Sequence, residues 1–135
     1  VQWTLAPAAY FRDINNPIGF NKFSTFLAEA NNERNFDQTR KDKWLSLKHA
    51  RFIKWEDDTM IDPNESTWWG QYFINEDTKE LQVLSRFETQ VYKQDLIGIR
   101  TLEEEGRADF IAIPGDHMHF NHEQLNELVK DSFSL

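Results

Sequence analysis

Cysteine is absent from the sequence. Its absence excludes a disulfide framework, a thiolate metal site and a cysteine nucleophile. The sequence also has no apolar run near the roughly 18 residues that a membrane-spanning helix needs, so we expect no membrane span. A third absence concerns catalysis, because no G-x-S-x-G motif, a common setting for a nucleophilic serine, occurs anywhere in the chain.

Basic residues are outnumbered by acidic ones. The chain has 15 Lys and Arg against 23 Asp and Glu, which gives a net charge of −8 and a pI near 4.9. Such a charge argues against nucleic acid and anionic membrane surfaces as partners. Aromatic residues make up 14% of the chain, so we expect a core of few large side chains or an apolar groove.

Residues 1–50 are predicted to be helical and irregular. Apolar residues spaced three and four apart predict an amphipathic helix over Phe20–Ala30. A polar loop leads to a second predicted helix around Asp37–His49, for which Asp37 is a suitable N-cap. These two helices offer little apolar surface to each other, so we expect them to form a lid that rests on another part of the protein.

Residues 51–135 show an alternation of strands and helices, which predicts an α/β fold with a boundary near residue 50. The last helix should begin after Asn121, which forms a capping box with Gln124. Its apolar stripe consists of Leu125, Leu128, Val129 and Phe133. The other predicted elements are a strand at Phe52–Trp55, a hairpin of Gln71–Ile74 and Leu81–Leu84, a helix within Leu96–Glu105 that Gly106 ends, and a strand at Ala108–Ile113.

Two candidate catalytic residues follow two of the predicted strands. Asp58 lies in an acidic loop after the first strand, and His117 lies in a Pro-Gly turn after the last one. Because ligands of open α/β sheets bind outside the carboxyl ends of the strands, both side chains could share one site. An acid there would orient the histidine of a Ser-Asp-His triad. Asp57 and Asp62, in the same loop as Asp58, are alternative acids.

The histidines also permit a metal hypothesis. His117, His119 and His122 could supply nitrogen ligands, and Asp116 could supply a carboxylate. However, the H-E-x-x-H spacing is absent and His122 should lie in the first turn of the last helix. We therefore expect no resident metal and no other cofactor, while ordinary surface or core histidines remain a third interpretation.

One N-glycosylation sequon is present, Asn64-Glu65-Ser66, in a turn-rich stretch where we expect an exposed loop. Asn64 is therefore a candidate glycosylation site. The chain begins with Val1 rather than Met, which suggests a proteolytically processed product or a trimmed sequence.

Several motifs, in this order, resemble the C-terminal part of the lysosomal palmitoyl-protein thioesterase family. The similarity runs in register over roughly residues 5–135. Its most specific parts are the D-P-x-x-S/T-x-W block and a terminal Gly-Asp-His. The matching positions are Trp55–Gly70, Glu88-Thr89, Tyr92, Gln94-Asp95, Leu96, Gly98, Gly115-Asp116-His117 and, upstream, Ala9-Tyr10-Phe11, Phe26-Leu27-Ala28, Asn31 and Glu33-Arg34.

The resemblance implies an α/β-hydrolase that removes long fatty acyl groups from cysteine thioesters of proteins. Residues 51–135 would form the C-terminal half of the hydrolase core, and residues 1–50 a helical segment that provides the lid and part of the acyl groove. Asp58 inherits the role of triad acid and His117 that of general base. Ala9, Tyr10 and Phe11 become candidate groove residues, and the location should be lysosomal or secreted.

Two departures from the family pattern matter. The family's sequon next to the catalytic acid is lost, because Asp57 stands where its Asn would be. The region that supplies the family's serine and oxyanion hole has no counterpart here. We therefore expect this chain to be inactive alone. It should supply the triad acid and histidine to a serine on a separate N-terminal chain, and the assembled protein should act on fatty-acylated proteins. The alternative is a non-catalytic module, derived from a thioesterase, that binds a lipid or a protein.

Overall fold

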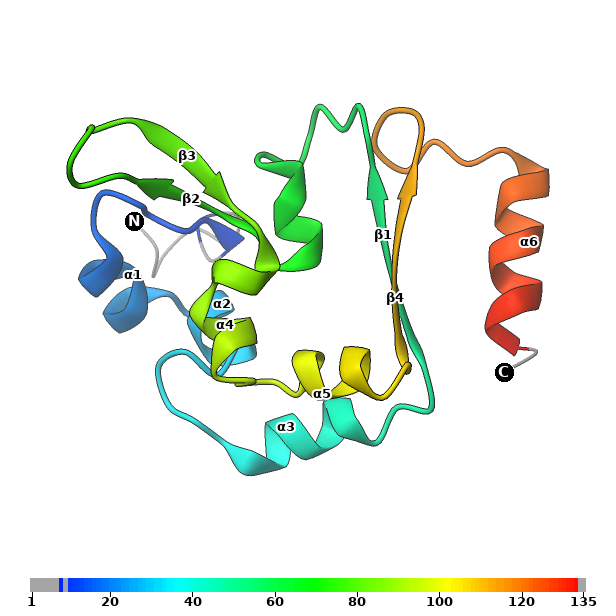
Figure 1. Ribbon diagram of the computed structural model, residues 1–135, viewed down its shortest axis with the longest axis horizontal. Coiled ribbons are helices and arrows are strands. Elements are labelled where there is room, and N and C mark those ends of the chain that lie inside the picture. Colours follow the sequence, from blue (N-terminus) through cyan, green and yellow to red (C-terminus); the bar gives the residue numbers. More distant parts are fainter. Residues whose placement is uncertain (1–7, 9, 134–135) are drawn as a thin grey trace.

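Two parallel strands, β1 (Ala50–Trp55) and β4 (Ala108–Ile113), form the sheet that organises the chain. The structure is a computed structural model that describes residue 8 and residues 10–133 (Figure 1). The two strands pair over their whole length, and their carboxyl ends lie at the same edge of the sheet. The predicted strand over 108–113 is confirmed with its bounds, and β1 begins two residues earlier than predicted.

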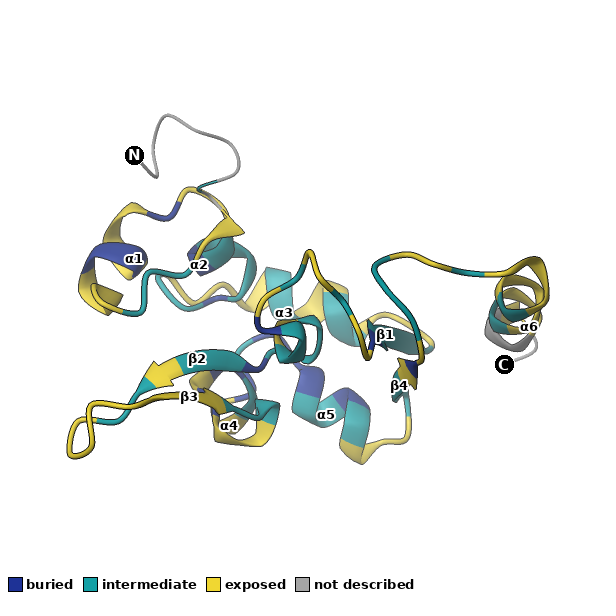
Figure 2. Ribbon diagram, turned by 90° about the horizontal axis from the view of Figure 1, so that it is seen from above, coloured by how far each residue is buried: buried dark blue, intermediate teal, exposed yellow. Residues whose placement is uncertain are grey.

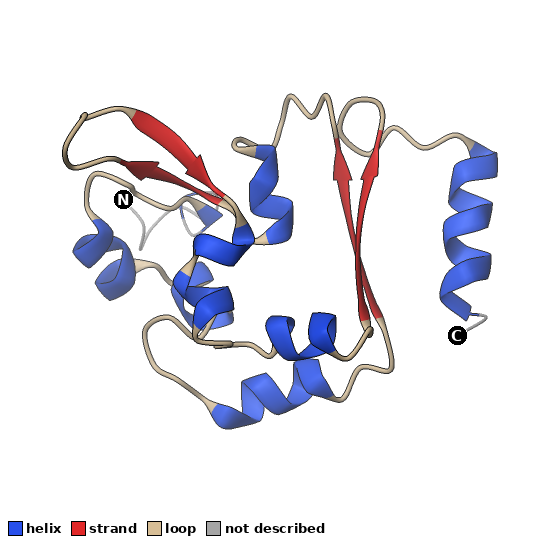
Figure 3. Cartoon of the chain, viewed as in Figure 1, coloured by secondary structure: helices blue, strands red, loops and turns tan. Residues whose placement is uncertain are grey.

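A second sheet is the predicted hairpin of β2 (Gln71–Ile74) and β3 (Leu81–Leu84), paired antiparallel. The side chain of Asn75 accepts hydrogen bonds from the backbone N–H groups of Asp77 and Thr78, which is the local geometry that favours Asn in a turn. Figure 3 shows the two sheets in red with short helices between them.

The helix predicted over 20–30 is wrong as a single element. The structure has two short helices instead, α1 (Pro17–Phe23) and α2 (Leu27–Ala30). Ser24 ends α1 with an extended backbone, and its hydroxyl accepts a hydrogen bond from the N–H of Ala28. The apolar residues keep spacings of three and four across this break, so periodicity alone could not detect it.

Helix α3 (Gln38–Leu45) begins as predicted, with the side chain of Asp37 accepting a hydrogen bond from the N–H of Thr39, but it ends four residues early. It lies against α5 (Ile99–Glu104), and Lys41 pairs with Asp95 at 2.8 Å. The early helices therefore rest on later parts of the chain. The division into two segments at residue 50 stays a prediction.

Short helical segments connect β1 to β4. They are η2 (Asn64–Trp68), η3 (Arg86–Glu88), α4 (Gln90–Lys93) and α5, which ends before Gly106. Gly106 has φ +67°, a conformation that favours glycine at the end of a helix. The buried side chains Val91, Ile97 and Ile99 form the core of this connection, and Phe52 and Phe110 of the sheet pack against it.

The last helix, α6 (His122–Phe133), stands apart from the others. Its predicted capping box is confirmed, because Asn121 and Gln124 exchange side-chain and backbone hydrogen bonds. Figures 1 and 2 show α6 on one side of the β1–β4 sheet and the other described helices on the opposite side. Among the described helices, none is long and apolar enough to cross a membrane.

Candidate active site

Asp58 and His117 meet beyond the carboxyl ends of the two parallel strands. Asp58 follows β1 by three residues, and His117 follows β4 by four. Nδ1 of His117 lies 2.8 Å from Oδ2 of Asp58. The parallel pairing of Trp55 with Ile113 at the strand ends brings the two loops together, although the two residues are far apart in the sequence.

The Asp58 carboxylate is fixed from two directions. Its side chain is only 2% exposed. Burial by itself raises the pKa of Asp58, but the hydrogen bonds from His117 and from the N–H groups of Ile61 and Met60 outweigh it, so the pKa lies below its usual value. Since Oδ1 accepts from both backbone groups, Oδ2 is left for the histidine.

The His117 imidazole is oriented but accessible, with 28% of its side chain exposed. Because Asp58 is an acceptor when ionised, Nδ1 of a neutral His117 carries the proton and Nε2 has the free lone pair. Among the described residues, no other side chain is hydrogen-bonded to this ring. Trp55 flanks it, with ring centroids 6.0 Å apart, and Phe120 contacts Trp55 in turn at 4.8 Å.

Asp116 joins the two loops. Its carboxylate accepts hydrogen bonds from the N–H and hydroxyl of Thr59, each at 2.9 Å, and from the N–H of His117 at 2.7 Å. The N–H groups of Thr59 and His117, together with the Thr59 hydroxyl, lower the pKa of Asp116. From the sequence, Asp116 was a candidate only for a metal ligand. Its position directly before His117 was the available signal, but its partner Thr59 could not be identified without the strand pairing.

The alternative acids do not contact His117. Asp62 instead accepts a hydrogen bond from the Tyr72 hydroxyl at 2.6 Å, which raises the pKa of Tyr72. Asp57 is exposed and donates its backbone N–H to the carbonyl of Gly115, a second tie between the two loops. The structure therefore brings Asp58, of the three carboxylates, to the histidine.

The histidines of the metal hypothesis do not converge. Within residues 8 and 10–133, no group of three or more His, Asp and Glu side chains is arranged to hold a metal ion. His122 lies in the first turn of α6, as predicted. Asp116 is instead bound to Thr59 and to the backbone of His117.

Tyr10 and Phe11 line a cavity of about 430 Å³ near the Asp58 loop. Apolar and aromatic side chains from other elements complete its wall, together with Asp62 and Pro63 of that loop; they include Leu27, Trp69, Tyr72 and Val91. Ala9, the third candidate groove residue, lies outside the described residues. The cavity extends from the loop that carries the candidate acid toward the N-terminal segment.

The sequon residue Asn64 is half-buried at the start of η2. Its side-chain N–H₂ group donates to the backbone carbonyls of Trp55 and Glu56, each at 3.2 Å. A glycan on this nitrogen would replace one of the two hydrogens and displace one bond. Glycosylation of Asn64 stays a prediction.

Comparison with known proteins identifies relatives of this chain. The family model described as palmitoyl protein thioesterase matches residues 1–117. The chain is 37% identical to palmitoyl-protein thioesterase 1 of Caenorhabditis elegans over 98% of its length, and 30% identical to palmitoyl-protein thioesterase 3 of Dictyostelium discoideum over 87%. It is 32% identical to lysosomal thioesterase PPT2-B of Xenopus laevis over 78% of its length.

The chain spans less than half of each of these relatives, at 44%, 40% and 36% of their respective lengths. Its parallel strands and flanking helices correspond to part of an α/β-hydrolase fold. On the family match and on the identity over nearly the whole chain, it belongs to the palmitoyl protein thioesterase family.

Proposed function

We propose that this chain supplies the acid and the general base of a serine-type thioesterase that cleaves long-chain fatty acyl thioesters from protein cysteines. The observation that carries the proposal is the 2.8 Å contact between His117 Nδ1 and a buried Asp58 carboxylate at the carboxyl ends of parallel strands. The nucleophilic serine belongs to an N-terminal polypeptide outside these 135 residues. Two relatives named as lysosomal thioesterases support a lysosomal location.

In the proposed reaction, Nε2 of His117 accepts the proton of the serine hydroxyl while the serine oxygen attacks the thioester carbonyl. Asp58 stabilises the imidazolium that forms. When the tetrahedral intermediate collapses, the carbon–sulfur bond breaks and Nε2 returns its proton to the cysteine sulfur. Water then attacks the acyl-serine while Nε2 of His117 accepts one of its protons. When the second tetrahedral intermediate collapses, the carbon–oxygen bond to serine breaks, Nε2 returns the proton to the serine oxygen, and the fatty acid is released.

We assign the acyl chain to the cavity lined by Tyr10 and Phe11. Aromatic and aliphatic side chains form about half of its wall, and Asp62 and Pro63 of the Asp58 loop lie at its border, so an acyl chain could lie there with its carbonyl toward that loop. Tyr10→Ala and Phe11→Ala should raise KM for palmitoyl substrates more than for short acyl substrates. Equal effects on both chain lengths would remove the cavity from the proposal.

The test begins with natively purified protein, labelled with a fluorophosphonate probe that reacts with activated serines. Mass spectrometry should find the probe on a peptide outside the present sequence, and palmitoyl-thioester turnover should accompany it. His117→Ala should abolish both labelling and turnover, whereas His119→Ala, a neighbouring histidine, should preserve them. Labelling that persists in His117→Ala would overturn the assignment of His117 as the general base.

A non-catalytic role is the second candidate, favoured by the absence of a G-x-S-x-G motif from the sequence. In that case the cavity would hold an acyl chain, or a partner protein, without cleavage. Purified material that binds a palmitoyl ligand but contains no fluorophosphonate-reactive serine would support this alternative.

A further inference from the structure

One wall of the Tyr10–Phe11 cavity is built from a stretch with little regular secondary structure. Tyr10, Phe11 and Ile14 line the cavity from the segment before α1, which is blue in Figure 1. Tyr10 and Phe11 are 64% and 61% exposed, so their own burial contributes little to holding them in place. The position of this wall therefore depends on the contacts that its neighbours make with other elements.

Arg12, which lies between these residues and also lines the cavity, is tied to a distant part of the chain. Its Nη2 donates to both carboxylate oxygens of Glu33, at 2.7 and 2.5 Å, across 21 residues of sequence. The guanidinium carbon lies 4.3 Å from the ring centroid of Phe20, a buried side chain of α1. The Arg12 and Glu33 side chains are only 26% and 12% exposed, so solvent screens this pair less than a fully exposed one.

Glu33 is itself held by the two short helices α1 and α2. Its N–H donates to the carbonyl of Ala28 in α2 at 2.9 Å, and its carbonyl accepts a hydrogen bond from the side chain of Asn21 in α1 at 3.3 Å. Leu27, the first residue of α2, lines the same cavity as the stretch before α1. The ion pair therefore joins two walls of one cavity.

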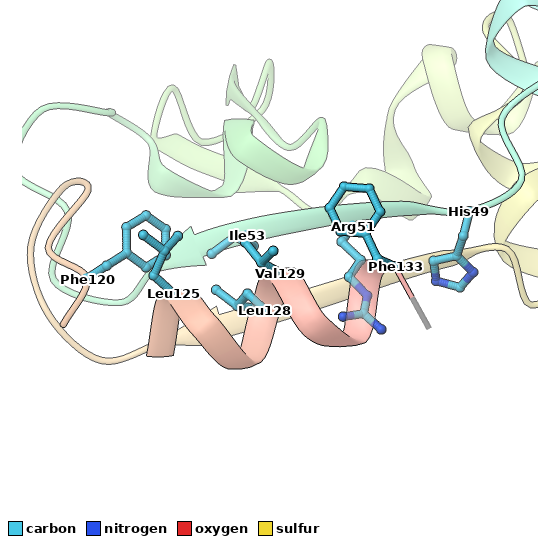
Figure 4. Close-up of a pocket in the computed structure, with 8 residues that line it drawn as sticks. All are labelled: His49, Arg51, Ile53, Phe120, Leu125, Leu128, Val129 and Phe133. Atoms are coloured by element: carbon cyan, nitrogen blue, oxygen red, sulfur yellow. The ribbon is translucent and has the colours of Figure 1, made fainter. Parts of the chain in front are cut away.

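A second arginine beside a cavity makes a different kind of ion pair. Arg51 lines a groove of about 400 Å³ next to α6 (Figure 4), and it binds Asp109 at 3.2 Å. These two residues lie opposite each other in the parallel pairing of β1 with β4, so the strands already fix their separation. In the part of the chain that the structure describes, the stretch around Arg12 belongs to no sheet, so its ion pair is a larger part of what holds it.

We propose that Arg12 and Glu33 are positioning residues that fix this wall of the cavity and thereby favour long acyl chains over short ones. A long chain lies against Tyr10 and Phe11, and it binds best when these rings are already in place. Without the ion pair, binding must also order the wall, which costs binding free energy for each side chain that is immobilised. A short chain near the Asp58 loop does not reach this wall. The inference rests on the proposed function only in naming an acyl chain as the occupant.

The test measures Kd for two analogues in the natively assembled protein. A palmitoyl ketone and an octanoyl ketone, in which a methylene group replaces the thioester sulfur, can bind but cannot be cleaved. Arg12→Ala and Glu33→Ala should each weaken palmitoyl binding by about tenfold and octanoyl binding by less than about twofold, because only the long chain contacts the wall. The double variant should lose little more than either single one, since both substitutions remove the same interaction. Equal losses for both chain lengths would overturn the proposal.

Arg34→Ala is the matched control. Arg34 follows Glu33 in the sequence, pairs with Glu29 at 3.1 Å and donates to the carbonyl of Ser24, so it stabilises the same helices without lining this cavity. Chain-length selectivity should be unchanged in this variant. A selective loss of palmitoyl binding as large as that in Arg12→Ala would mean that the general stability of α1 and α2 sets the selectivity, and it would overturn the role of the ion pair.

Arg12→Lys covers the case in which the alanine variants do not assemble. An ammonium group can pair with Glu33 but has no flat face to stack on Phe20, so palmitoyl binding should weaken by about threefold with octanoyl binding unchanged. Palmitoyl binding as tight as in the unchanged protein would overturn the proposal.

Fluorophosphonate labelling separates this inference from the proposed function. A reactive serine in every variant, together with unchanged chain-length selectivity, would overturn the role of the ion pair and leave the function. A selective loss of palmitoyl binding without any reactive serine would support the ion pair and overturn the function. Failure of the unchanged protein to bind the palmitoyl ketone would overturn the acyl assignment of the cavity and, with it, this inference.

Discussion

The β1–β4 sheet carries an Asp–His pair at each end. Asp58 and His117 meet beyond the carboxyl ends of the strands at 2.8 Å, and Asp109 and His49 meet at the amino ends at 2.9 Å. The surroundings differ. The Asp58 side chain is 2% exposed and bonded to two backbone N–H groups, whereas the Asp109 side chain is 42% exposed and shared with Arg51.

These differences separate a candidate catalytic pair from a structural one. The guanidinium of Arg51 also pairs with Asp109, so His49 is not the sole partner of that carboxylate. Asp58 contacts no arginine or lysine among the described residues, so a proton gained by His117 is stabilised directly by the carboxylate. A short distance is therefore common to both pairs, and the burial of the acid and its backbone donors distinguish them.

The largest effect on turnover should come from replacing each of the two histidines, His117 and His49, in separate variants. His117→Ala should lower palmitoyl-thioester turnover of the assembled protein by roughly 10⁴-fold or more, because the general base is lost. His49→Ala should leave turnover nearly unchanged. A greater loss of turnover in His49→Ala than in His117→Ala, with both variants still assembled, would contradict this assignment of the two pairs.

Replacing the acids should give the same order of effects on kcat as replacing the histidines, with Asp58 more important than Asp109, but the effects should be slightly smaller. Asp58→Asn should reduce kcat by roughly 10³- to 10⁴-fold, because an amide can favour the wrong tautomer of His117. Asp109→Asn should have little effect on kcat. Asp62→Asn is the decisive control, since a large loss there would mean that Asp62 replaces Asp58 as the acid in the working enzyme.

The link between the two loops should matter to an intermediate degree. Asp116→Ala removes the hydrogen bonds to Thr59 and to the backbone of His117, and we expect turnover to fall by about 10- to 100-fold through misplacement of the imidazole. Thr59→Val removes the hydroxyl bond but keeps the hydrogen bond from the backbone N–H of residue 59, so turnover should fall less than in Asp116→Ala. The loss of kcat in Thr59→Val relative to the unchanged protein measures the contribution of the Thr59 hydroxyl, and the further loss in Asp116→Ala measures that of the two backbone hydrogen bonds. An Asp116→Ala enzyme with normal kcat would show that strand pairing alone aligns the site.

The smallest predicted effect concerns stability at acid pH. The pKa of Asp58 lies below its ordinary value of 3.8, so its contribution to the free energy of unfolding is present above that pH and is lost as the pH falls through the lower folded-state value. The pKa of Asp116 is also lowered, so its contribution to the free energy of unfolding is likewise lost as the pH falls. Urea unfolding measured from pH 3 to 6 should show a shallower acid decline in Asp58→Asn than in the unchanged protein. An identical slope would mean that Asp58 is not held ionised.

Features that depend on neighbouring residues were predictable. Asp37 and the Asn121–Gln124 box are caps whose partners lie within a few residues, and both are confirmed by hydrogen bonds. The strand at 108–113 is similarly marked by its own apolar composition. The helix predicted over 20–30 failed because the buried Ser24 ends α1 with an extended backbone. Its hydroxyl accepts from the N–H of Ala28 in α2, and its carbonyl accepts from Arg34.

By itself, the sequence determined the strands, the caps and the candidate histidine, because these follow from local composition and spacing. Which of three neighbouring carboxylates meets His117 was decided only by the tertiary structure. The pairing of Trp55 with Ile113 sets how the two loops face each other, and the turn in which Oδ1 of Asp58 binds Met60 and Ile61 aims its other oxygen at the ring. The contact joins positions 59 residues apart, and such a contact depends on strand register rather than on any local pattern.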